Sequence, residues 1–254
     1  MTELKGTKIL LTGASSGIGR TLALELAREG ASLYITGRNL KRLRAAEKES
    51  SVFGTPVYSG LLDITKEDSV RRTAAAVRKA LGGLDILINN AGGEFFWGPF
   101  SSQKPETELL QIQTNYLGTL GMIRAVLPGM LNQGRGIIVN MASLTGIIPT
   151  AGMASYSASK FALVGISRAL DGELKPRGVR VLCVLPPNAD TPMLGRTKLP
   201  GYPVPVSPEA VASAVIQGIK RKSPRIWVGV SWPMSLLYRL FPSYVEGVLA
   251  RKLR

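Results

Sequence analysis

Short apolar runs alternate with longer helical patterns along most of this chain, and that alternation constrains the fold more than any other feature. The apolar runs, which have the length and composition of β-strands, lie at 7–12, 31–36, 56–61, 84–88, 136–141, 179–184 and 225–228. Between them, apolar residues recur with helical spacing at 17–29, 39–49, 66–80, 105–131, 154–174 and 208–221. Short, continuously apolar strands are typical of a parallel sheet that is covered on both faces. The sequence therefore predicts a doubly wound α/β fold with a parallel seven-stranded sheet and helices on both faces.

The chain has no internal repeat and no Gly-rich or Ser-rich linker that would divide it. We therefore expect one catalytic domain over 1–230 and a hydrophobic and basic tail over 231–254. A hydrophobic content of 45% over 254 residues is enough for a sizeable core. The segment 186–206 is irregular and rich in proline, and it follows the sixth strand. Ligands of such folds bind beyond the carboxyl ends of the strands, so this segment is expected to lie over the site.

Composition excludes several kinds of chemistry. The chain contains no histidine, so a Ser-His-Asp triad, a histidine base and a histidine metal ligand are all excluded. Its single cysteine, Cys183, can form neither an internal disulfide nor a thiolate-rich metal site, and we expect no metal. One cysteine fits a reducing compartment, and the N-terminal apolar run is too short for a signal peptide, so a cytoplasmic location is expected.

A glycine-rich turn follows the first predicted strand and leads into the first helix. Gly13, Gly17 and Gly19 would let the backbone approach a pyrophosphate that sits at the positive end of the helix. Three glycines alone also fit a merely tight strand-to-helix turn. Their position directly after the first strand favours the dinucleotide interpretation.

The end of the second strand bears on which dinucleotide is bound. An NAD site usually has an acidic residue here for the ribose 2′-hydroxyl, whereas a 2′-phosphate requires arginine. This strand ends without an acid and is followed by Arg38, which predicts NADP(H), with NAD(H) as the alternative. Lys41 or Arg42 could assist, and an ordinary solvated charge is the competing interpretation of Arg38. Asp63, directly after the third strand, can accept a hydrogen bond from an adenine amino group or cap the next helix.

Tyr156 and Lys160 are the strongest local signal for catalysis. A spacing of four places the phenol and the ammonium on one helical face. A nearby ammonium stabilises a phenolate and lowers the pKa of tyrosine, which permits acid-base chemistry without histidine. Ser143, after the fifth strand, can donate a hydrogen bond to a carbonyl and its developing oxyanion. Taken singly, the pair could be surface packing and Ser143 could be a helix cap.

Taken together and in order, these motifs identify a resemblance to the short-chain dehydrogenase/reductase family of single-domain Rossmann oxidoreductases over roughly residues 5–230. The matching residues are Thr12-Gly13-x-x-x-Gly17-x-Gly19, Asp63, Asn89-Asn90-Ala91-Gly92, Asn115, Ser143 and Tyr156-x-x-x-Lys160.

The resemblance implies a role for each matching residue. Tyr156 would exchange the proton while hydride moves between the nicotinamide and a carbonyl carbon, and Lys160 would bind the nicotinamide ribose and depress the pKa of Tyr156. Ser143 would polarise the carbonyl, and Asn115 would hold a water that links Lys160 to solvent. The implied cofactor contacts also include Gly13, Ser15, Ser16, Gly17, Ile18, Gly19, Arg38, Asn39, Asp63, Ile64, Asn90, Ala91, Gly92, Pro186 and Thr191.

One position departs from the family pattern. After the sixth strand the family usually has Pro-Gly, whereas this chain has Pro186 followed by Pro187. Proline fixes φ and removes an N–H, so the loop has fewer conformations open to it than one with glycine. Pro186 and Thr191 are still expected to contact the nicotinamide.

The substrate side is expected to be hydrophobic, because the segments after the strands are apolar or aromatic there. The residues concerned are Leu144, Ile147 and Ile148, Glu94-Phe95-Phe96-Trp97, and 193–206. The tail could pack on the protein or on a partner subunit, cover the pocket, or rest on a membrane with its basic residues towards lipid phosphates. Packing is the favoured interpretation and membrane contact the second.

Three function classes follow from these features. The first is an NADP(H)-dependent reductase or dehydrogenase acting on a small-molecule carbonyl or alcohol, expected from the family to be a homodimer or homotetramer. The second is a non-catalytic dinucleotide sensor. The presence of a proton donor argues against it, because a sensor does not need one. The third is nucleic-acid binding driven by the net charge of 32 − 17 = +15. No zinc spacing, basic zipper or aromatic-basic RNA motif accompanies that charge, so we expect no nucleic-acid partner.

Overall fold

A computed structural model describes residues 3–193 and 205–250 of the protein, and its centre is the predicted seven-stranded sheet. The strands are β1 (Lys8–Leu11), β2 (Ser32–Gly37), β3 (Val57–Leu61), β4 (Ile86–Asn89), β5 (Gly136–Met141), β6 (Val179–Leu185) and β7 (Arg225–Trp227). They pair in the order β3-β2-β1-β4-β5-β6-β7, and every pairing is parallel. The order reverses between β1 and β4, which is where a doubly wound sheet opens a crevice for ligands.

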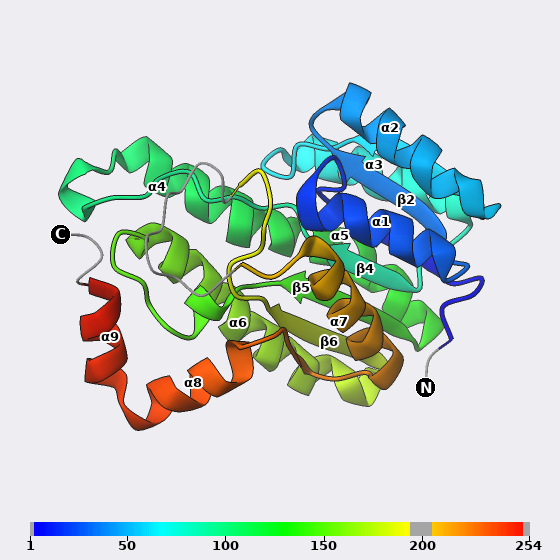
Figure 1. Cartoon of the computed structure of the whole chain (residues 1–254). Helices are drawn as coiled ribbons and strands as arrows, with labels where there is room; N and C mark the ends of the chain where they lie inside the picture. Colours follow the sequence, from blue (N-terminus) through cyan, green and yellow to red (C-terminus); the bar gives the residue numbers. More distant parts are fainter. Residues whose placement is uncertain (1–2, 194–204, 251–254) are drawn as a thin grey trace.

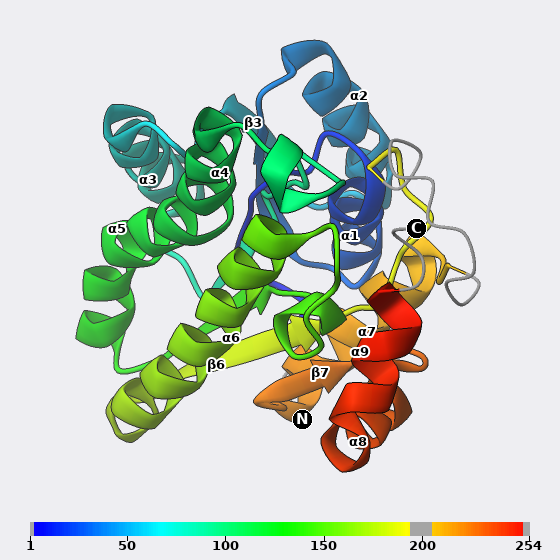
Figure 2. The same ribbon diagram turned by 90° about the vertical axis from the view of Figure 1, so that its left-hand side faces the viewer.

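Helices cover both faces of the sheet, as predicted (Figure 1). They are α1 (Gly17–Arg28), α2 (Leu40–Ser50), α3 (Glu67–Leu81), α4 (Pro105–Ile112), α5 (Gly118–Gln133), α6 (Ala154–Leu174), α7 (Pro208–Arg221), α8 (Ser231–Leu240) and α9 (Pro242–Ala250). Figure 2 shows α3, α4, α5 and α6 on one side of the sheet and α1, α2 and α7 on the other.

Successive side chains along each strand point to opposite faces of the sheet and pack into two separate cores. Ile9 and Leu11 of β1 pack with α1, α2 and α7, whereas Leu10 points to the opposite core with α3 and α5. The same period of two divides β4, where Leu87 joins the second core. Each fully buried side chain of this size contributes about 1.5–3 kcal/mol of transfer free energy, so the two cores together fix the register of the strands.

The pattern at 105–131 predicts one continuous helix, and the structure differs from that prediction. A π-helical turn, η3 (Gln113–Leu117), separates α4 from α5. A π turn widens the backbone ladder and changes which side chains face inward. It places Thr114 and Asn115 in the interior, next to the carboxyl end of β4.

The tail forms two short helices that follow β7. Val245 and Leu249 of α9 are buried against Leu144 and Ile148, which belong to the segment after β5. The tail therefore packs on its own domain, which is part of what the sequence predicts for it. Within the described ranges 3–193 and 205–250, no helix has the length and apolar character needed to cross a membrane.

The turn after β1 gives a direct test of packing. A Cβ on Gly19 would lie 2.2 Å from the carbonyl oxygen of Gly13, a backbone atom that cannot move aside cheaply. We expect Gly19→Ala to lower the free energy of unfolding by about 1–3 kcal/mol, measured by urea denaturation.

The matched control is Gly165→Ala on α6, where an added Cβ meets no atom within 4 Å. This control should raise stability by roughly 0.5–1 kcal/mol, because alanine restricts the unfolded chain and favours helix. Equal stability of the two variants would contradict this prediction, because it would show that the turn can shift to make room for the added Cβ.

Candidate active site

An open cleft with a volume of about 410 Å³ runs along the carboxyl ends of the strands. It gathers segments that follow β1, β2, β3, β4, β5 and β6. Every residue that the sequence predicts as a cofactor contact lines this cleft, and so do Ser143, Tyr156 and Lys160. The structure thus brings the predicted residues to one place. Asn115 lies behind the cleft wall, where it is 1% exposed.

The glycine turn is clamped to the end of β4 by hydrogen bonds. The side-chain amide of Asn90 donates to the carbonyl oxygens of Thr12 and Gly13, at 3.0 and 3.1 Å. In return, the hydroxyl of Thr12 accepts from the backbone N–H groups of Asn90 and Ala91, at 3.0 and 2.9 Å. This reciprocal contact holds the β1–α1 turn and the β4 loop at a fixed separation.

There is no room for a Cβ where the turn after β1 meets the loop after β4. At Gly13, where φ is +73°, an added Cβ would lie 2.7 Å from the Cα of Ala91. Gly17, where φ is +53°, packs against Thr191 from the loop after β6. The N-terminus of α1, which begins at Gly17, therefore faces the cleft through a surface of bare backbone. Bare amides at a helix N-terminus fit a dinucleotide pyrophosphate.

Two arginines line the far end of the cleft, beyond β2. Arg38 and Arg42 are both exposed and both line it, whereas Lys41 does not. Asn39 lines the cleft as well, and its side chain caps α2 by accepting from the backbone N–H of Arg42 at 3.0 Å. Asn39 therefore orients the helix that carries Arg42.

Asp63 lines the cleft after β3 and makes a local turn. Its carboxylate accepts hydrogen bonds from the hydroxyl and the backbone N–H of Thr65, at 2.7 and 3.0 Å. These bonds, with a smaller contribution from nearby Lys66 and Arg38, lower the pKa of Asp63. The cap of α3 is Lys66, so Asp63 does not occupy the cap position that the sequence left open for it.

Tyr156 lies in the first turn of α6, partly buried in the cleft. Desolvation raises the pKa of its phenol, the charge of Glu94 raises it further, and a hydrogen bond with Ser143 acts in the opposite direction. The direction is opposite to the sequence expectation, which considered only the ammonium of Lys160. Desolvation is the largest contribution to the pKa of Tyr156, and the nitrogen of the Lys160 ammonium lies 5.6 Å from the centre of the phenol ring.

Lys160 follows one turn later on α6 and is buried. Its ammonium donates a hydrogen bond to the backbone oxygen of Met141 at 2.8 Å. Burial lowers the pKa of Lys160 to about 8. At neutral pH the side chain is thus still mainly cationic, although it lies close to the point of losing its proton.

Asn115 and Gln111 fix the loop that follows β4. The amide of Asn115 donates to the Gly93 carbonyl oxygen at 2.9 Å and to the Ser159 hydroxyl at 3.0 Å, and its oxygen accepts from the Gly93 N–H at 2.9 Å. Gln111 also donates to the Gly93 carbonyl and accepts from the N–H of Phe95. Together they hold the segment that carries Glu94 beside Tyr156.

None of the sequence motifs singles out Gln111. It is 1% exposed, and a polar side chain buried to that extent is expected to have a structural or functional partner. The detectable signal is its spacing of four from Asn115, which places both amides on one helical face.

Ser143 follows β5 and begins the short helix η4 (Leu144–Gly146). Its hydroxyl oxygen accepts from the N–H of Thr145 at 3.1 Å, so it is a cap as well as a cleft residue. The N–H of Leu144 donates to the carbonyl oxygen of Pro186 at 2.8 Å and ties this loop to the one after β6. Pro187, which stands where the family usually has glycine, also lines the cleft.

The structure places only some of the residues that the sequence predicts for the substrate side in the cleft. Glu94, Phe95 and Met193 line the cleft, whereas Leu144 and Ile148 are buried beneath α9. Residues 194–204 of the predicted segment 193–206 lie outside the described part of the chain. No group of three or more metal-ligating side chains occurs within residues 3–193 and 205–250.

The fold and the cleft together define an oxidoreductase of the nicotinamide-dinucleotide type. The family model described as short chain dehydrogenase matches residues 7–199, so the chain belongs to the short-chain dehydrogenase family. An uncharacterized oxidoreductase of Staphylococcus saprophyticus is 36% identical over 224 residues, which cover 88% of this chain and 95% of that protein.

Two solved structures are similar to this one. A short chain dehydrogenase/reductase from Burkholderia phymatum in complex with NAD matches with a TM-score of 0.87 and 23% identity, over 97% of each chain. A variant of actinorhodin polyketide ketoreductase with NADPH matches with a TM-score of 0.82 and 30% identity, over 90% of this chain and 97% of the other. The first supports the fold alone, and the pair includes both dinucleotides.

The buried ammonium can be tested without any substrate. Because burial lowers the pKa of Lys160 to about 8, its NMR signal should titrate near that pH, while an exposed lysine titrates near about 10.4. The signal is assigned by its loss in Lys160→Met. A titration at the ordinary pH of lysine would contradict the burial argument.

Proposed function

We propose that the protein is an NADP(H)-dependent oxidoreductase that transfers hydride between nicotinamide and the carbonyl carbon of a hydrophobic ketone, a 3-ketoacyl compound or a lipid-like substrate, or in reverse on the matching secondary alcohol. The observation that supports this most is the position of Ser143, Tyr156 and Lys160 in the same cleft as the glycine turn and Arg38. The expected homodimer or homotetramer and cytoplasmic location stay predictions.

When bound, the reduced nicotinamide supplies the hydride. The hydroxyl of Ser143 would donate to the substrate oxygen and hold it beside the phenol, whose pKa Ser143 lowers. Tyr156 would then transfer its proton to that oxygen as negative charge develops on it. Its raised pKa keeps this proton in place at neutral pH, which suits the reducing direction.

Lys160 would stabilise the phenolate that remains. Its ammonium is buried with Met141 as a hydrogen-bond partner, so the charge acts in surroundings of low dielectric. Asn115 holds Gly93 and the loop that forms the opposite wall, and we propose that the open π turn around it admits the water of a proton relay.

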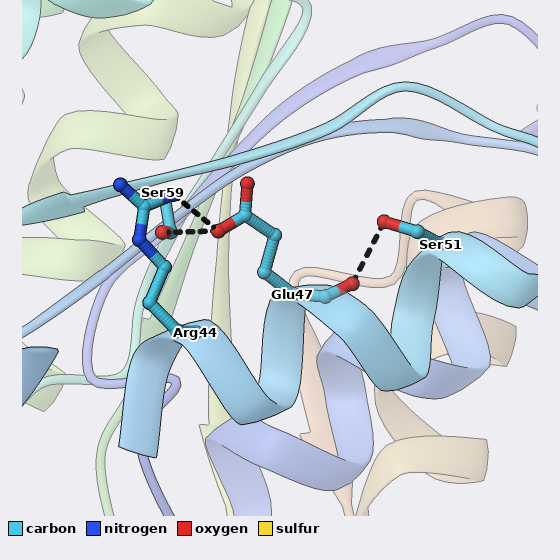
Figure 3. Close-up of polar contacts among 4 residues, drawn as sticks. All are labelled: Arg44, Glu47, Ser51 and Ser59. Carbon is cyan, nitrogen blue, oxygen red and sulfur yellow. Dashed lines mark hydrogen bonds and ion pairs between the residues drawn. The ribbon is translucent and has the colours of Figure 1, made fainter. Parts of the chain in front are cut away.

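The preference for NADP(H) is supported by the charges at the far end of the cleft. Arg38 and Arg42 line that end. The first acidic residue after the strand, Glu47, is paired with Arg44 at 2.8 Å and accepts from Ser59 at 2.7 Å (Figure 3). A 2′-phosphate would meet guanidinium groups there. NAD(H) is the alternative.

Arg38→Gln tests the cofactor preference. Loss of a charge-assisted contact with a 2′-phosphate should reduce kcat/KM for NADPH by about 10–100-fold and leave kcat/KM for NADH nearly unchanged. Steady-state kinetics with both cofactors and one ketone measure this change.

Arg44→Gln is the matched control, because Arg44 lies on the same helix, binds Glu47 and does not line the cleft. It should leave both values unchanged. A wild-type enzyme that prefers NADH, or equal effects of the two variants, would contradict the assignment.

Tyr156→Phe tests the proton donor. Removing the phenolic oxygen should lower kcat by about 10²–10⁴-fold, because general acid catalysis supplies acceleration of that size. NADPH binding, followed by fluorescence titration, should stay within about twofold, because the ring is retained. Turnover at the wild-type rate would reject the role of Tyr156, and a wild-type protein that binds NADPH without turning over any ketone would favour the sensor.

A further inference from the structure

Helices α8 and α9 form an appendage at one edge of the molecule. Both views show α9 continuing from the end of α8 at an angle, outside the helices that cover the sheet (Figures 1 and 2). Their inward side chains pack on the domain, with Val245 and Leu249 buried and Met234 and Tyr238 partly buried in the same cluster. The hydroxyl of Tyr238 donates to Glu246 at 2.8 Å and connects the two helices.

The opposite side of these helices, here named the outward face, is apolar and exposed. Its large side chains are between 39% and 68% exposed: Trp232, Leu236, Leu237, Leu240, Phe241, Tyr244 and Val248. Soluble monomers rarely expose so many neighbouring large apolar side chains, and such patches mark contact surfaces. Leucine with aromatic residues is typical of helices that lie in a lipid interface.

The charge of this segment is positive. Residues 231–254 contain Arg239, Arg251, Lys252 and Arg254 against a single acid, Glu246, so the side chains carry 4 − 1 = +3. The hydrogen bond from Tyr238 engages the one carboxylate. A segment whose sequence combines large apolar side chains with excess positive charge is complementary in composition to a lipid surface with an apolar interior and anionic headgroups.

We propose that the outward face of α8 and α9 docks on an anionic phospholipid membrane, with Trp232, Leu240 and Tyr244 entering the interface. A second copy of the chain fits this face less well. Each copy carries +15 overall and +3 in the tail, so a contact between two tails would bring like charges together. Since neither helix can span, the contact is peripheral.

The helix that would dock on the membrane also contacts the wall of the cleft. The inward residues of α9 pack on Leu144 and Ile148, and Ser143 immediately precedes Leu144. The wall beside the substrate position is therefore supported by the same helix that contacts lipid. The proposal concerns membrane binding itself, so it stands or fails independently of the proposed reaction.

The test is co-sedimentation of the full chain with vesicles. Wild-type protein should bind phosphatidylcholine vesicles that contain phosphatidylserine, bind vesicles of phosphatidylcholine alone weakly, and be released by added NaCl. The combined variant Trp232→Ser, Leu240→Ser, Tyr244→Ser should weaken binding at least about tenfold, because three exposed anchors are lost while the buried cluster is kept.

The matched control replaces three equally exposed apolar residues elsewhere, Phe100→Ser, Leu109→Ser and Leu61→Ser, which are 62%, 57% and 56% exposed. It should bind as the wild type does, and thermal melts should show both variants folded. Absence of wild-type binding, equal binding to both lipids, or equal loss in both variants would overturn the proposal. So would a change from oligomer to monomer in the tail variant alone, which would identify the face as a contact between copies.

Discussion

The contact between the first turn and the end of β4 holds the site together. Four hydrogen bonds join Thr12 and Gly13, after β1, to Asn90 and Ala91, after the adjacent parallel strand β4, and the glycines allow the two backbones to approach. This contact lies at the point where the strand order reverses, so it sets the width of the crevice. The phosphate end, the β4 loop and the helix that follows are all positioned relative to it.

Burial governs the chemistry at the other end of the cleft. Desolvation raises the pKa of Tyr156 and lowers that of Lys160, so burial shifts both groups towards their neutral forms, although Lys160 stays mainly cationic at neutral pH. At neutral pH this leaves a protonated phenol beside an ammonium that can still give up its proton. A chain without histidine thereby holds an acid and a charge of the kind that proton transfer requires.

The sequence predicts most of the architecture because strand and helix periods differ clearly. The seven strands follow from apolar patterning, whereas most of the cofactor residues that gather in one cleft are predicted from the ordered family motifs. The π turn at Asn115 could not be predicted, because its five residues fit an ordinary helical pattern.

The remaining differences between prediction and structure arise from contacts that only the folded chain makes. The pKa direction of Tyr156 depends on burial and on Glu94, which is far away in sequence. Gln111 acts through loop atoms that only the folded chain brings near. The sequence shows that the tail is hydrophobic and basic but not which of its side chains contact the domain. The apolar pattern therefore predicts Leu144 and Ile148 on the substrate side, whereas the structure packs them against α9.

The central claim is that the Tyr156 phenol, held protonated by burial and by Glu94, exchanges the proton during hydride transfer. The most direct measurement is the pH profile of kcat/KM for oxidation of a secondary alcohol in wild type and Glu94→Gln. Oxidation needs the phenolate, so kcat/KM rises with pH, and removing a negative charge that raises the pKa of Tyr156 should move that rise to lower pH. A rise at the same pH in both proteins would contradict the account.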